Sequence, residues 1–403
     1  MTKKYSVITE VRLLTLAIMI IGSNSFLLSP VLTNVAHSLD TEPVTVARAI
    51  SAFGGATAVS AFLFAFSPIA GRLDTRSVLS LGGVVMALAL VGCALSPNWW
   101  VLALCQGLIG LMVGVMLPTI YTAATASAPA GQSAARLGKV IRGWGIALVL
   151  GVPFSAFVSD LAGWRAAYWI LAGCAALTVP GFLRLPRRVA AGNGPSGMIP
   201  LTVLRLPGVM PILAICGVYM IGFYGLYPYL GDHLHHAFGA SASEAGLVVL
   251  AYGAGFGLAS FVMAAVERSG LQRAFPLTLA GLAVIYCGVG PLTDTMATAL
   301  PVAFVWGIIN HIGVNLIILS LSRHGEDTRA TLMGLHTTIT YASIFAGPLM
   351  MGALYEANGF TAAALLSALL LATGAVLAFR FKAYWQPDQQ PVKGTYADRI
   401  DER

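Results

Sequence analysis

Charged residues are scarce in this chain. Only 10% of its 403 residues are Asp, Glu, Lys or Arg, whereas 57% are hydrophobic, and the mean hydropathy is +0.81. So few charges cannot cover the surface of a water-soluble protein of this length. The composition therefore excludes a soluble globular fold and predicts a multi-pass protein of the lipid bilayer.

The sequence also lacks the motifs that several function classes need. Its five cysteines lie inside apolar runs, without the paired spacing of a metal or disulfide site. It contains no phosphate-binding loop, no His-Glu-x-x-His zinc motif and no nucleophile elbow. We therefore expect no enzymatic activity, no cofactor and no bound metal, and transport driven directly by ATP on this chain is disfavoured. A receptor or an enzyme would need a large soluble loop or a catalytic cluster, and neither is present.

The formal net charge of +7 does not come from a basic patch. Basic residues are scattered over short loops, so nucleic-acid binding is not expected. With both termini placed in the cytoplasm, all of the 23 Lys and Arg residues except Arg48 and Arg165 fall on the cytoplasmic side, as the positive-inside rule requires. We therefore expect a bacterial inner-membrane protein with cytoplasmic termini. A cleavable signal is not expected, because the first apolar run continues past signal-peptide length.

A helix needs about 20 apolar residues to cross the hydrocarbon core of a bilayer, and runs of this kind recur along the whole chain. Twelve membrane-spanning helices are expected, which gives an all-α polytopic fold. Their predicted ranges are 11–34, 47–70, 77–96, 99–124, 137–160, 164–183, 208–231, 242–265, 274–292, 298–321, 331–355 and 360–380.

One polar segment interrupts this pattern. It contains Arg184, Arg187 and Arg188 and then a Gly-Asn-Gly-Pro-Ser-Gly run, which is typical of a linker. The chain is thereby divided into two halves that can be compared as repeats. The predicted parts are an N-terminal six-helix bundle (1–183), a cytoplasmic linker (184–207), a C-terminal six-helix bundle (208–382) and a cytoplasmic polar tail (383–403).

The fifth predicted helix has an unusual composition. Gly143, Gly145 and Gly151 remove side chains along it, and Pro153 removes a backbone donor two residues after Gly151. In a bilayer such glycines let a neighbouring helix approach closely, so we expect a bent helix that packs tightly and acts in gating. The eleventh helix repeats these features, with Gly347-Pro348 in the same role and Gly359 in place of the exit residue Gly163.

The twelve helices, the loop Gly71–Arg76 after helix two, the Gly-x-Pro of helix five and the Gly163–Arg165 start of helix six together resemble the major facilitator superfamily. More narrowly, the chain is similar to the drug:proton antiporter branch, which contains bacterial sugar-efflux and drug-efflux pumps. The resemblance covers the chain up to residue 383 and implies two pseudo-symmetric bundles around a central cavity that work by alternating access. The gating residues that it implies are Gly71, Asp74, Arg76, Gly151, Pro153, Glu267, Arg268, Gly347 and Pro348.

Three positions depart from the pattern of that family. The loop motif around Asp74 is abbreviated, and Gln106-Gly107 in helix four lacks the Arg that commonly precedes it. Arg142 stands in helix five, where an uncharged residue is usual. An ionisable residue within a membrane helix marks a pathway or a pair, so Arg142 is a candidate for the substrate cavity, where it would favour an anionic or polyhydroxyl substrate. The alternative is that it snorkels to the lipid headgroups together with Arg136 and Lys139.

Asp232 is the only acidic residue close to a helix interior, which makes it a candidate proton carrier. It follows an aromatic run in helix seven, and tyrosines suit sugars and amphipathic drugs because each joins an apolar ring to a polar hydroxyl. The alternative for these aromatics is an interfacial belt. The cavity candidates in the run are Tyr219, Tyr224 and Tyr227.

Further polar residues lie within predicted helices one, ten and eleven, where a lipid-facing position would be costly. The cavity candidates among them are Asn24, Asn310, Asn315, Thr340 and Tyr341, with interhelical hydrogen bonding as the alternative. His311 and His336 are candidates for proton coupling, since histidine titrates near neutral pH. Three histidines after Asp232 could ligate a transition metal, although histidines in a loop usually face water. They are His233, His235 and His236.

The function that these residues favour is proton-coupled efflux of a small organic solute, such as a drug, sugar or metabolite, by alternating access. The alternatives are a proton-coupled uptake permease of the same fold and a carrier for a metal or metallophore. The expected partners are a small-molecule substrate, protons and the lipid bilayer, and the protein is expected to be a monomer.

Overall fold

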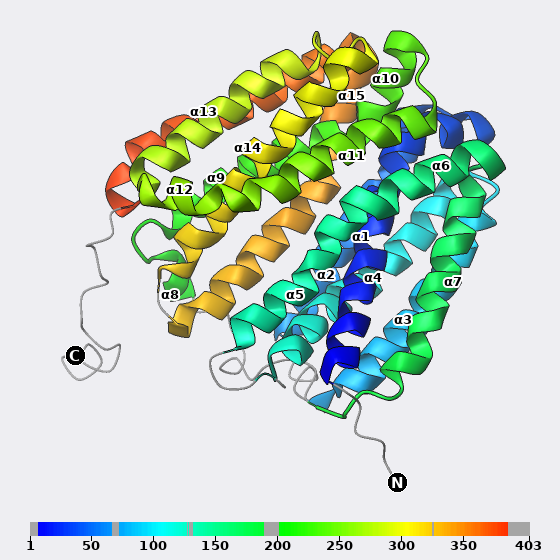
Figure 1. Cartoon of the computed structure of the whole chain (residues 1–403), viewed down its shortest axis with the longest axis horizontal. Coiled ribbons are helices and arrows are strands. Elements are labelled where there is room, and N and C mark those ends of the chain that lie inside the picture. Colours follow the sequence, from blue (N-terminus) through cyan, green and yellow to red (C-terminus); the bar gives the residue numbers. More distant parts are fainter. Residues whose placement is uncertain are drawn as a thin grey trace.

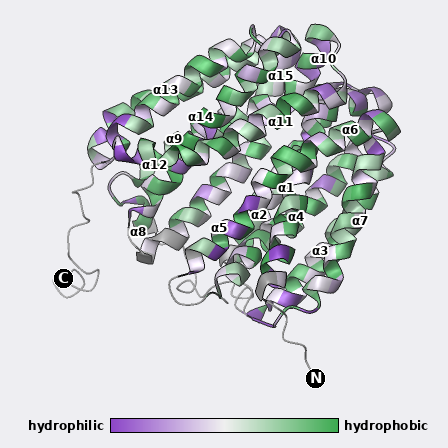
Figure 2. Ribbon diagram, viewed as in Figure 1, coloured by the Kyte–Doolittle hydropathy of each residue, from purple (hydrophilic) through white to green (hydrophobic). Residues whose placement is uncertain are grey.

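The computed structural model describes residues 7–66, 72–126, 128, 132–188, 201–324 and 326–385. Within these ranges every regular element is a helix, and the prediction of an all-α membrane fold is confirmed (Figure 1). Gly71, half of the linker (189–200) and most of the tail lie outside the described residues. Hydrophobic residues cover the helices along most of their length, and hydrophilic residues gather toward the helix ends (Figure 2).

The first half of the chain forms one bundle around α1. Its spans run continuously except in the fifth, which is divided by a π-helical segment, η2. The elements are α1 (Val7–Ser38), α2 (Pro43–Phe66), α3 (Thr75–Ala94), α4 (Trp99–Ala126), α5 (Ser133–Ile146), η2 (Ala147–Gly151), α6 (Val152–Ala162) and α7 (Trp164–Phe182).

The second half forms the other bundle, and several of its spans contain short 3₁₀ segments. The elements are α8 (Leu201–Leu204), α9 (Val209–Leu226), η3 (Tyr227–Tyr229), α10 (Leu230–Phe238), α11 (Ala242–Leu258), η4 (Ala259–Phe261), α12 (Met263–Arg268), α13 (Leu271–Val289), α14 (Met296–Ser322), α15 (Glu326–Arg380) and η5 (Lys382–Trp385).

The described helices account for twelve membrane spans. Ten segments are long and apolar enough to cross a membrane. The longest of them, Thr331–Arg380, contains two spans, because the backbone leaves the helical conformation at Gly359. The remaining span is α7, a 19-residue helix that begins at Trp164.

Two glycines turn the chain at equivalent places in the two bundles. Gly163, between α6 and α7, has φ 82° and ψ 155°, and Gly359, within α15, has φ 77° and ψ 179°. A β carbon is strained in this region of backbone space, so glycine is the residue that fits. The repeat inferred from Gly163 and Gly359 in the sequence is therefore present in the backbone.

The irregularity expected in helix five is a π turn rather than a simple bend. Pro153 lies in the first turn of α6 and has no N–H to donate, and the five-residue π helix η2 ends just before it. Gly151 permits close packing there, because a β carbon on it would lie 2.0 Å from the Ser23 hydroxyl oxygen. In the other bundle, a β carbon on Gly347 would lie 2.7 Å from the Gly225 nitrogen, so α15 crosses α9 at similarly close range.

We call the face at which α1 begins and η5 ends the terminal face, and the opposite face, near α10, the distal face (Figure 1). The two bundles pack together in their distal halves through three helix pairs. These pairs are α1 with η3 and α10, α2 with α15, and α6 and η2 with α11. The core of each bundle lies among its own six spans.

We expect Gly359→Ala to lower the free energy of unfolding by about 1–3 kcal/mol, because a β carbon strains the backbone at this position. Thermal unfolding of the detergent-purified protein measures the effect as a lower midpoint. Gly173→Ala is the matched control, since Gly173 lies inside α7 with nothing within 4 Å of an added β carbon. Equal midpoints for the two variants would contradict the strain at Gly359.

Candidate functional site

The tightest junction between the bundles lies near the distal face, where α1 meets η3 and α10. The Ser29 hydroxyl donates to the Tyr227 carbonyl oxygen at 2.7 Å. A β carbon on Gly231 would lie 2.3 Å from the Ser29 carbonyl oxygen, so only glycine allows this approach. The aromatic run of helix seven therefore ends at the interface between the two halves of the protein.

Asp232 lies at the centre of this junction and is only 1% exposed. Its Oδ1 accepts a hydrogen bond from the Thr33 hydroxyl at 2.7 Å, and its Oδ2 accepts one from the Tyr355 hydroxyl. Thr33 belongs to the N-terminal bundle and Tyr355 to α15 of the C-terminal bundle. A buried carboxyl group is costly unless it is hydrogen-bonded. The two hydroxyls meet this requirement, and the bond from Thr33 ties α1 to α10.

The three histidines that follow Asp232 have separate partners. His233 Nε2 lies 2.8 Å from the Thr293 hydroxyl oxygen, and its ring stacks on Phe360. His235 Nδ1 contacts the Ala240 carbonyl oxygen at 3.0 Å, and His236 Nδ1 lies 2.9 Å from the Asp232 carbonyl oxygen and 3.6 Å from its Oδ2. Across the described ranges, no three His, Cys, Asp or Glu side chains are grouped as a metal site.

A second tie between the bundles is made by Asp160, a residue that the sequence did not single out as a functional candidate. Its carboxylate oxygens accept from the Ala242 and Ser243 backbone nitrogens at 3.2 and 2.7 Å. These nitrogens are at the start of α11, where free N–H groups and the helix dipole attract an anion. The capping box of Ser241 and Glu244 is visible in the sequence and marks the start of a helix, which is where Asp160 binds.

Aromatic rings from both bundles meet at the middle of the interface. The Phe26 ring of α1 stacks with Tyr224 at 6.4 Å and packs edge-on against Tyr227 at 5.4 Å and Trp144 at 6.5 Å between ring centroids. The Trp144 indole N–H donates to the Tyr121 hydroxyl at 3.3 Å. Tyr224, Trp144 and Tyr121 are partly exposed, so this aromatic group presents both apolar faces and polar groups at the junction.

Each bundle also contains a buried polar network. In the N-terminal bundle the Asn24 and Gln106 amides are hydrogen-bonded to each other, and Gln106 donates to the Tyr168 hydroxyl at 2.9 Å. These contacts favour interhelical bonding for Asn24. Gln106, which the sequence marked only as a departure from the family pattern, is the centre of the network.

The network of the C-terminal bundle joins three helices. The Tyr219 hydroxyl donates to the Asn310 carbonyl oxygen at 2.6 Å and also contacts the Asn310 side-chain oxygen. The Asn310 amide contacts the Tyr252 hydroxyl. All three residues are buried, and interhelical bonding therefore describes Tyr219 and Asn310 better than an open cavity position.

The two histidines of helices ten and eleven each have a ring nitrogen that makes no hydrogen bond in the described part of the chain. His311 Nδ1 and His336 Nε2 are buried, and neither has a hydrogen-bond partner among the described residues. Asn315 donates to the His311 carbonyl oxygen at 2.8 Å, and the Thr340 hydroxyl donates to that of His336 at 2.9 Å. The ring of Tyr341 packs edge-on against Phe53 of the other bundle at 6.2 Å. Their roles in a cavity and in proton coupling stay predictions.

Arg142 is exposed on α5, whereas Arg136 is 6% exposed. Val149 lies two turns from Arg142 on the same helix face, and its Cγ2 would be 3.2 Å from a β carbon on Gly253 of α11. Arg142 therefore lies on the face of α5 that is directed toward α11. The sequence placed the three basic residues of α5 on one face, but their exposure shows that Arg136 is directed into the protein.

The loop after helix two makes its described contacts inside the N-terminal bundle. Asp74 caps α3, accepting from the Ser77 nitrogen at 3.0 Å and the Ser77 hydroxyl at 2.7 Å. Partial burial opposes ionisation, but these bonds and the positive charge of Arg187 hold the pKa of the Asp74 carboxyl below its usual value. Arg76 is partly exposed, and Glu267 and Arg268 are exposed. Their gating roles stay predictions.

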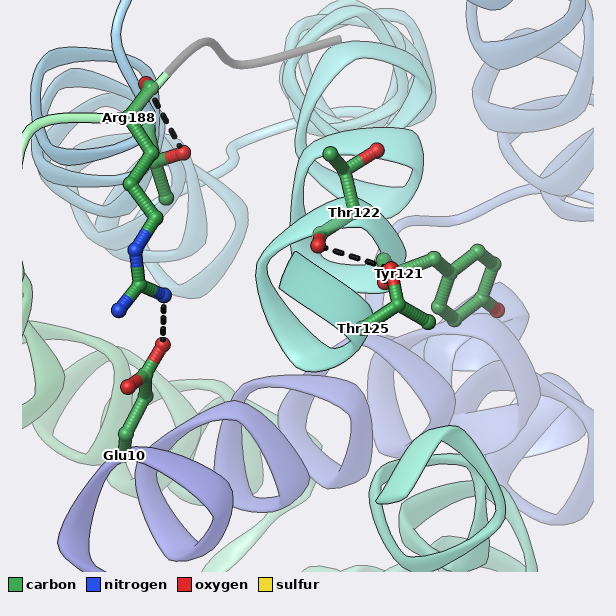
Figure 3. Close-up of polar contacts among 6 residues, drawn as sticks. Glu10, Tyr121, Thr122, Thr125 and Arg188 are labelled. Atoms are coloured by element: carbon green, nitrogen blue, oxygen red, sulfur yellow. Dashed lines mark hydrogen bonds and ion pairs between the residues drawn. The ribbon is translucent and has the colours of Figure 1, made fainter. Parts of the chain in front are cut away.

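The chain that follows α7 ties back to α1 and α3 at the terminal face. An Arg188 Nη donates to Glu10 Oε1 of α1 at 2.8 Å (Figure 3). The Arg188 carbonyl oxygen accepts from the Thr75 hydroxyl at 3.2 Å, as the same view shows, and from the Thr75 nitrogen at 2.7 Å. In the same view, the Thr125 hydroxyl of α4 donates to the Thr122 carbonyl oxygen at 3.0 Å. These bonds all lie within the N-terminal bundle.

The distal interface connects the bundles, and comparison with solved structures gives the same two-bundle fold. A bacterial homologue of the human lysosomal transporter Spinster, in an inward-facing and unoccupied conformation, superposes with a TM-score of 0.71 at 16% identity, covering 95% of this chain and 98% of the other. The nucleoside transporter NupG gives 0.73 at 16% identity, covering 94% and 100%. A D-xylose-proton symporter gives 0.73 at 12% identity, covering 94% and 98%.

Sequence comparison extends this likeness over the full fold. The uncharacterized MFS-type transporter YwfA of Bacillus subtilis is 27% identical over 386 residues, 94% of this chain and 93% of that protein. The transcription regulatory protein OpdE of Pseudomonas aeruginosa is 28% identical over 368 residues, 88% of this chain and 89% of that protein. The family model of the Major Facilitator Superfamily matches residues 14–323 and 212–399. The chain therefore belongs to the Major Facilitator Superfamily.

Proposed function

We propose that this MFS-type secondary transporter exports a small organic solute in exchange for protons. The observation that carries the proposal is the position of Asp232, a buried carboxylate hydrogen-bonded to both bundles at the junction that must open in alternating access. A titratable group at such a place couples protonation to the conformational equilibrium. This proposal assigns the chain to the drug:proton antiporter branch that its sequence resembles.

The charge asymmetry of the loops supports a cytoplasmic terminal face in a bacterial inner membrane. In that orientation, the bundles are joined on the extracellular side and the structure corresponds to an inward-facing state. The extracellular gate then consists of the Thr33–Asp232 hydrogen bond and the Asp160 cap on α11, while Tyr355 holds Asp232 from within the C-terminal bundle.

Opening of the extracellular side separates α1 from α10 and removes the Thr33 hydroxyl from Asp232. The carboxylate then meets water and takes up a proton at the acidic side of the membrane. When the gate closes again, the Thr33 hydroxyl returns to Asp232, and the proton leaves. We propose His311 and His336, whose buried ring nitrogens have no hydrogen-bond partner in the described chain, as the groups that take it toward the cytoplasm.

The aromatic group at the middle of the interface supports an organic substrate. Tyr224 and Trp144 offer ring faces beside polar groups, which suits ligands that combine apolar and hydroxyl surfaces. Arg142, on the side of α5 directed toward α11, adds a positive charge for an anionic or polyhydroxyl solute. A thermal-shift screen of sugars, nucleosides and amphipathic drugs selects the solute for transport assays, since a ligand that binds the folded state raises the unfolding midpoint.

We expect Asp232→Asn to abolish accumulation driven by a pH gradient while the solute still raises the unfolding midpoint, because an amide cannot carry the proton. Everted membrane vesicles with an imposed pH gradient measure the first property, and the thermal-shift assay measures the second. Asp294→Asn is the matched control, because Asp294 is an exposed carboxylate at the same end of the molecule. Normal pH-driven transport by Asp232→Asn would remove Asp232 from the coupling mechanism.

We expect the unaltered protein to accumulate the selected solute in everted vesicles whose interior is acidic, because an exporter pumps into their lumen as protons leave. Dissipating the pH gradient with an uncoupler should stop the accumulation. If right-side-out vesicles accumulate the solute with inward proton flow and everted vesicles do not, the protein is an uptake permease of the same fold.

A further inference from the structure

The packing of α6 and η2 on α11 follows a regular antiparallel register. Asp160 meets the start of α11 at Ala242, and a β carbon on Gly246 would lie 2.8 Å from the Ala156 β carbon. Farther along, a β carbon on Gly253 would lie 3.2 Å from the Leu148 backbone. Each step along α11 toward the terminal face is thus matched by an equal step back along α6, η2 and α5.

This close packing stops one turn beyond Gly253. The register places Gly257 opposite Gly145, but a β carbon on either glycine has nothing within 4 Å. Gly138, two turns before Gly145, is equally open. Gly246 and Gly253 of α11 permit a close approach to α6 and η2. Gly145 and Gly257 would permit an equally close approach, but in this conformation no atom of the opposite helix occupies the space beside them.

Opposite charges flank the open part of this helix pair. Lys139 and Arg142 lie on α5, and Glu267 lies on α12, which continues α11 toward the terminal face. All three side chains are exposed, and the ion pairs seen in the described chain do not include them. The register places Lys139 about one turn and Arg142 about two turns from Glu267, which is about 6 and 10 Å along the axis.

The direction of the side chains reduces this offset. Side chains of a helix lean toward its N-terminus. The N-terminus of α5 is at the terminal face, so Lys139 and Arg142 lean toward the level of Glu267. The N-terminus of α12 is directed toward the distal face, so Glu267 leans toward them. The ion pair thus becomes reachable once the two helices approach.

We propose that the open part of this helix pair closes in the outward-facing state. Gly145 then packs on Gly257, and Glu267 pairs with the basic residues Lys139 and Arg142 of α5. The inference rests on alternating access, as proposed above, and assigns its inner gate. It gives Arg142 a role in a membrane helix and gives Glu267 a partner in the N-terminal bundle.

Disulfide trapping tests the helix contact. A disulfide needs β carbons about 3.5–4.5 Å apart. Because nothing lies within 4 Å of a β carbon on Gly145 or on Gly257, we expect the pair Gly145→Cys with Gly257→Cys to link poorly in the conformation seen here. We expect copper-phenanthroline to link this pair in membranes, detected as a linked peptide by mass spectrometry, when the protein samples the outward-facing state. The matched control is Asp160→Cys with Ser243→Cys, which lie in contact at the distal face and should link at rest.

The two disulfides separate the possible failures. If the 160–243 link leaves transport of the solute chosen by thermal shift intact, alternating access is itself wrong. If that link blocks transport but the 145–257 pair never links, the inner gate proposed here is wrong. Linking of the 145–257 pair, which then blocks transport and is prevented by a prior 160–243 link, supports the proposal.

Charge exchange tests the ion pair without a transport substrate. In a Ser29→Cys background, a membrane-impermeant maleimide reports outward opening, because Ser29 is buried in the distal junction. We expect Glu267→Lys to slow this labelling by about two- to fivefold, as loss of an exposed ion pair would, and a second change, Lys139→Glu or Arg142→Glu, to restore it. Asp294→Lys, at an exposed carboxylate of the loop before α14, is the control for charge alone. Failure of both second changes to restore labelling would overturn the pairing.

Discussion

Every backbone polar group inside the hydrocarbon core must find its partner within the protein, because lipid offers none, and buried side-chain polar groups bear a similar cost. This constraint produces continuous helices, and it explains why the buried polar side chains occur in networks. Asn24 is satisfied by Gln106, and Asn310 is surrounded by Tyr219 and Tyr252. Each network lies entirely within its own bundle, so each bundle can move as a unit without breaking these hydrogen bonds.

The contacts that do cross between the bundles are of a different kind. Asp232 and Asp160 are carboxylates whose partners are a hydroxyl and two backbone amides across the interface. Water can replace such partners when the interface opens. Between these ties the helices meet through glycines such as Gly231 and Gly246. A small number of polar contacts between smooth helix surfaces lets the junction close tightly and still separate at moderate cost.

The two ends of the α5–α11 helix pair each carry a carboxylate that can join the two bundles. At the distal end the carboxylate of Asp160 lies on a helix N-terminus, and at the terminal end the proposed outward-facing state pairs the carboxylate of Glu267 with Lys139 and Arg142 of α5. One end is packed in this structure and the other is open. A transporter that exchanges these two contacts keeps a comparable number of interactions in both states, which keeps the two conformations close in free energy.

The sequence by itself determined the twelve spans, the turns at Gly163 and Gly359 and the break at Pro153, because apolar length, positive φ and a missing donor are local properties. It also identified Asp232, since acidic residues are rare near helix interiors. Only the tertiary structure brought Thr33 and Tyr355 to that carboxylate and Asp160 to α11, and withdrew Asn24 into a bundle network. Those partners come from helices far apart in the chain, and their meeting depends on packing geometry that no local pattern encodes.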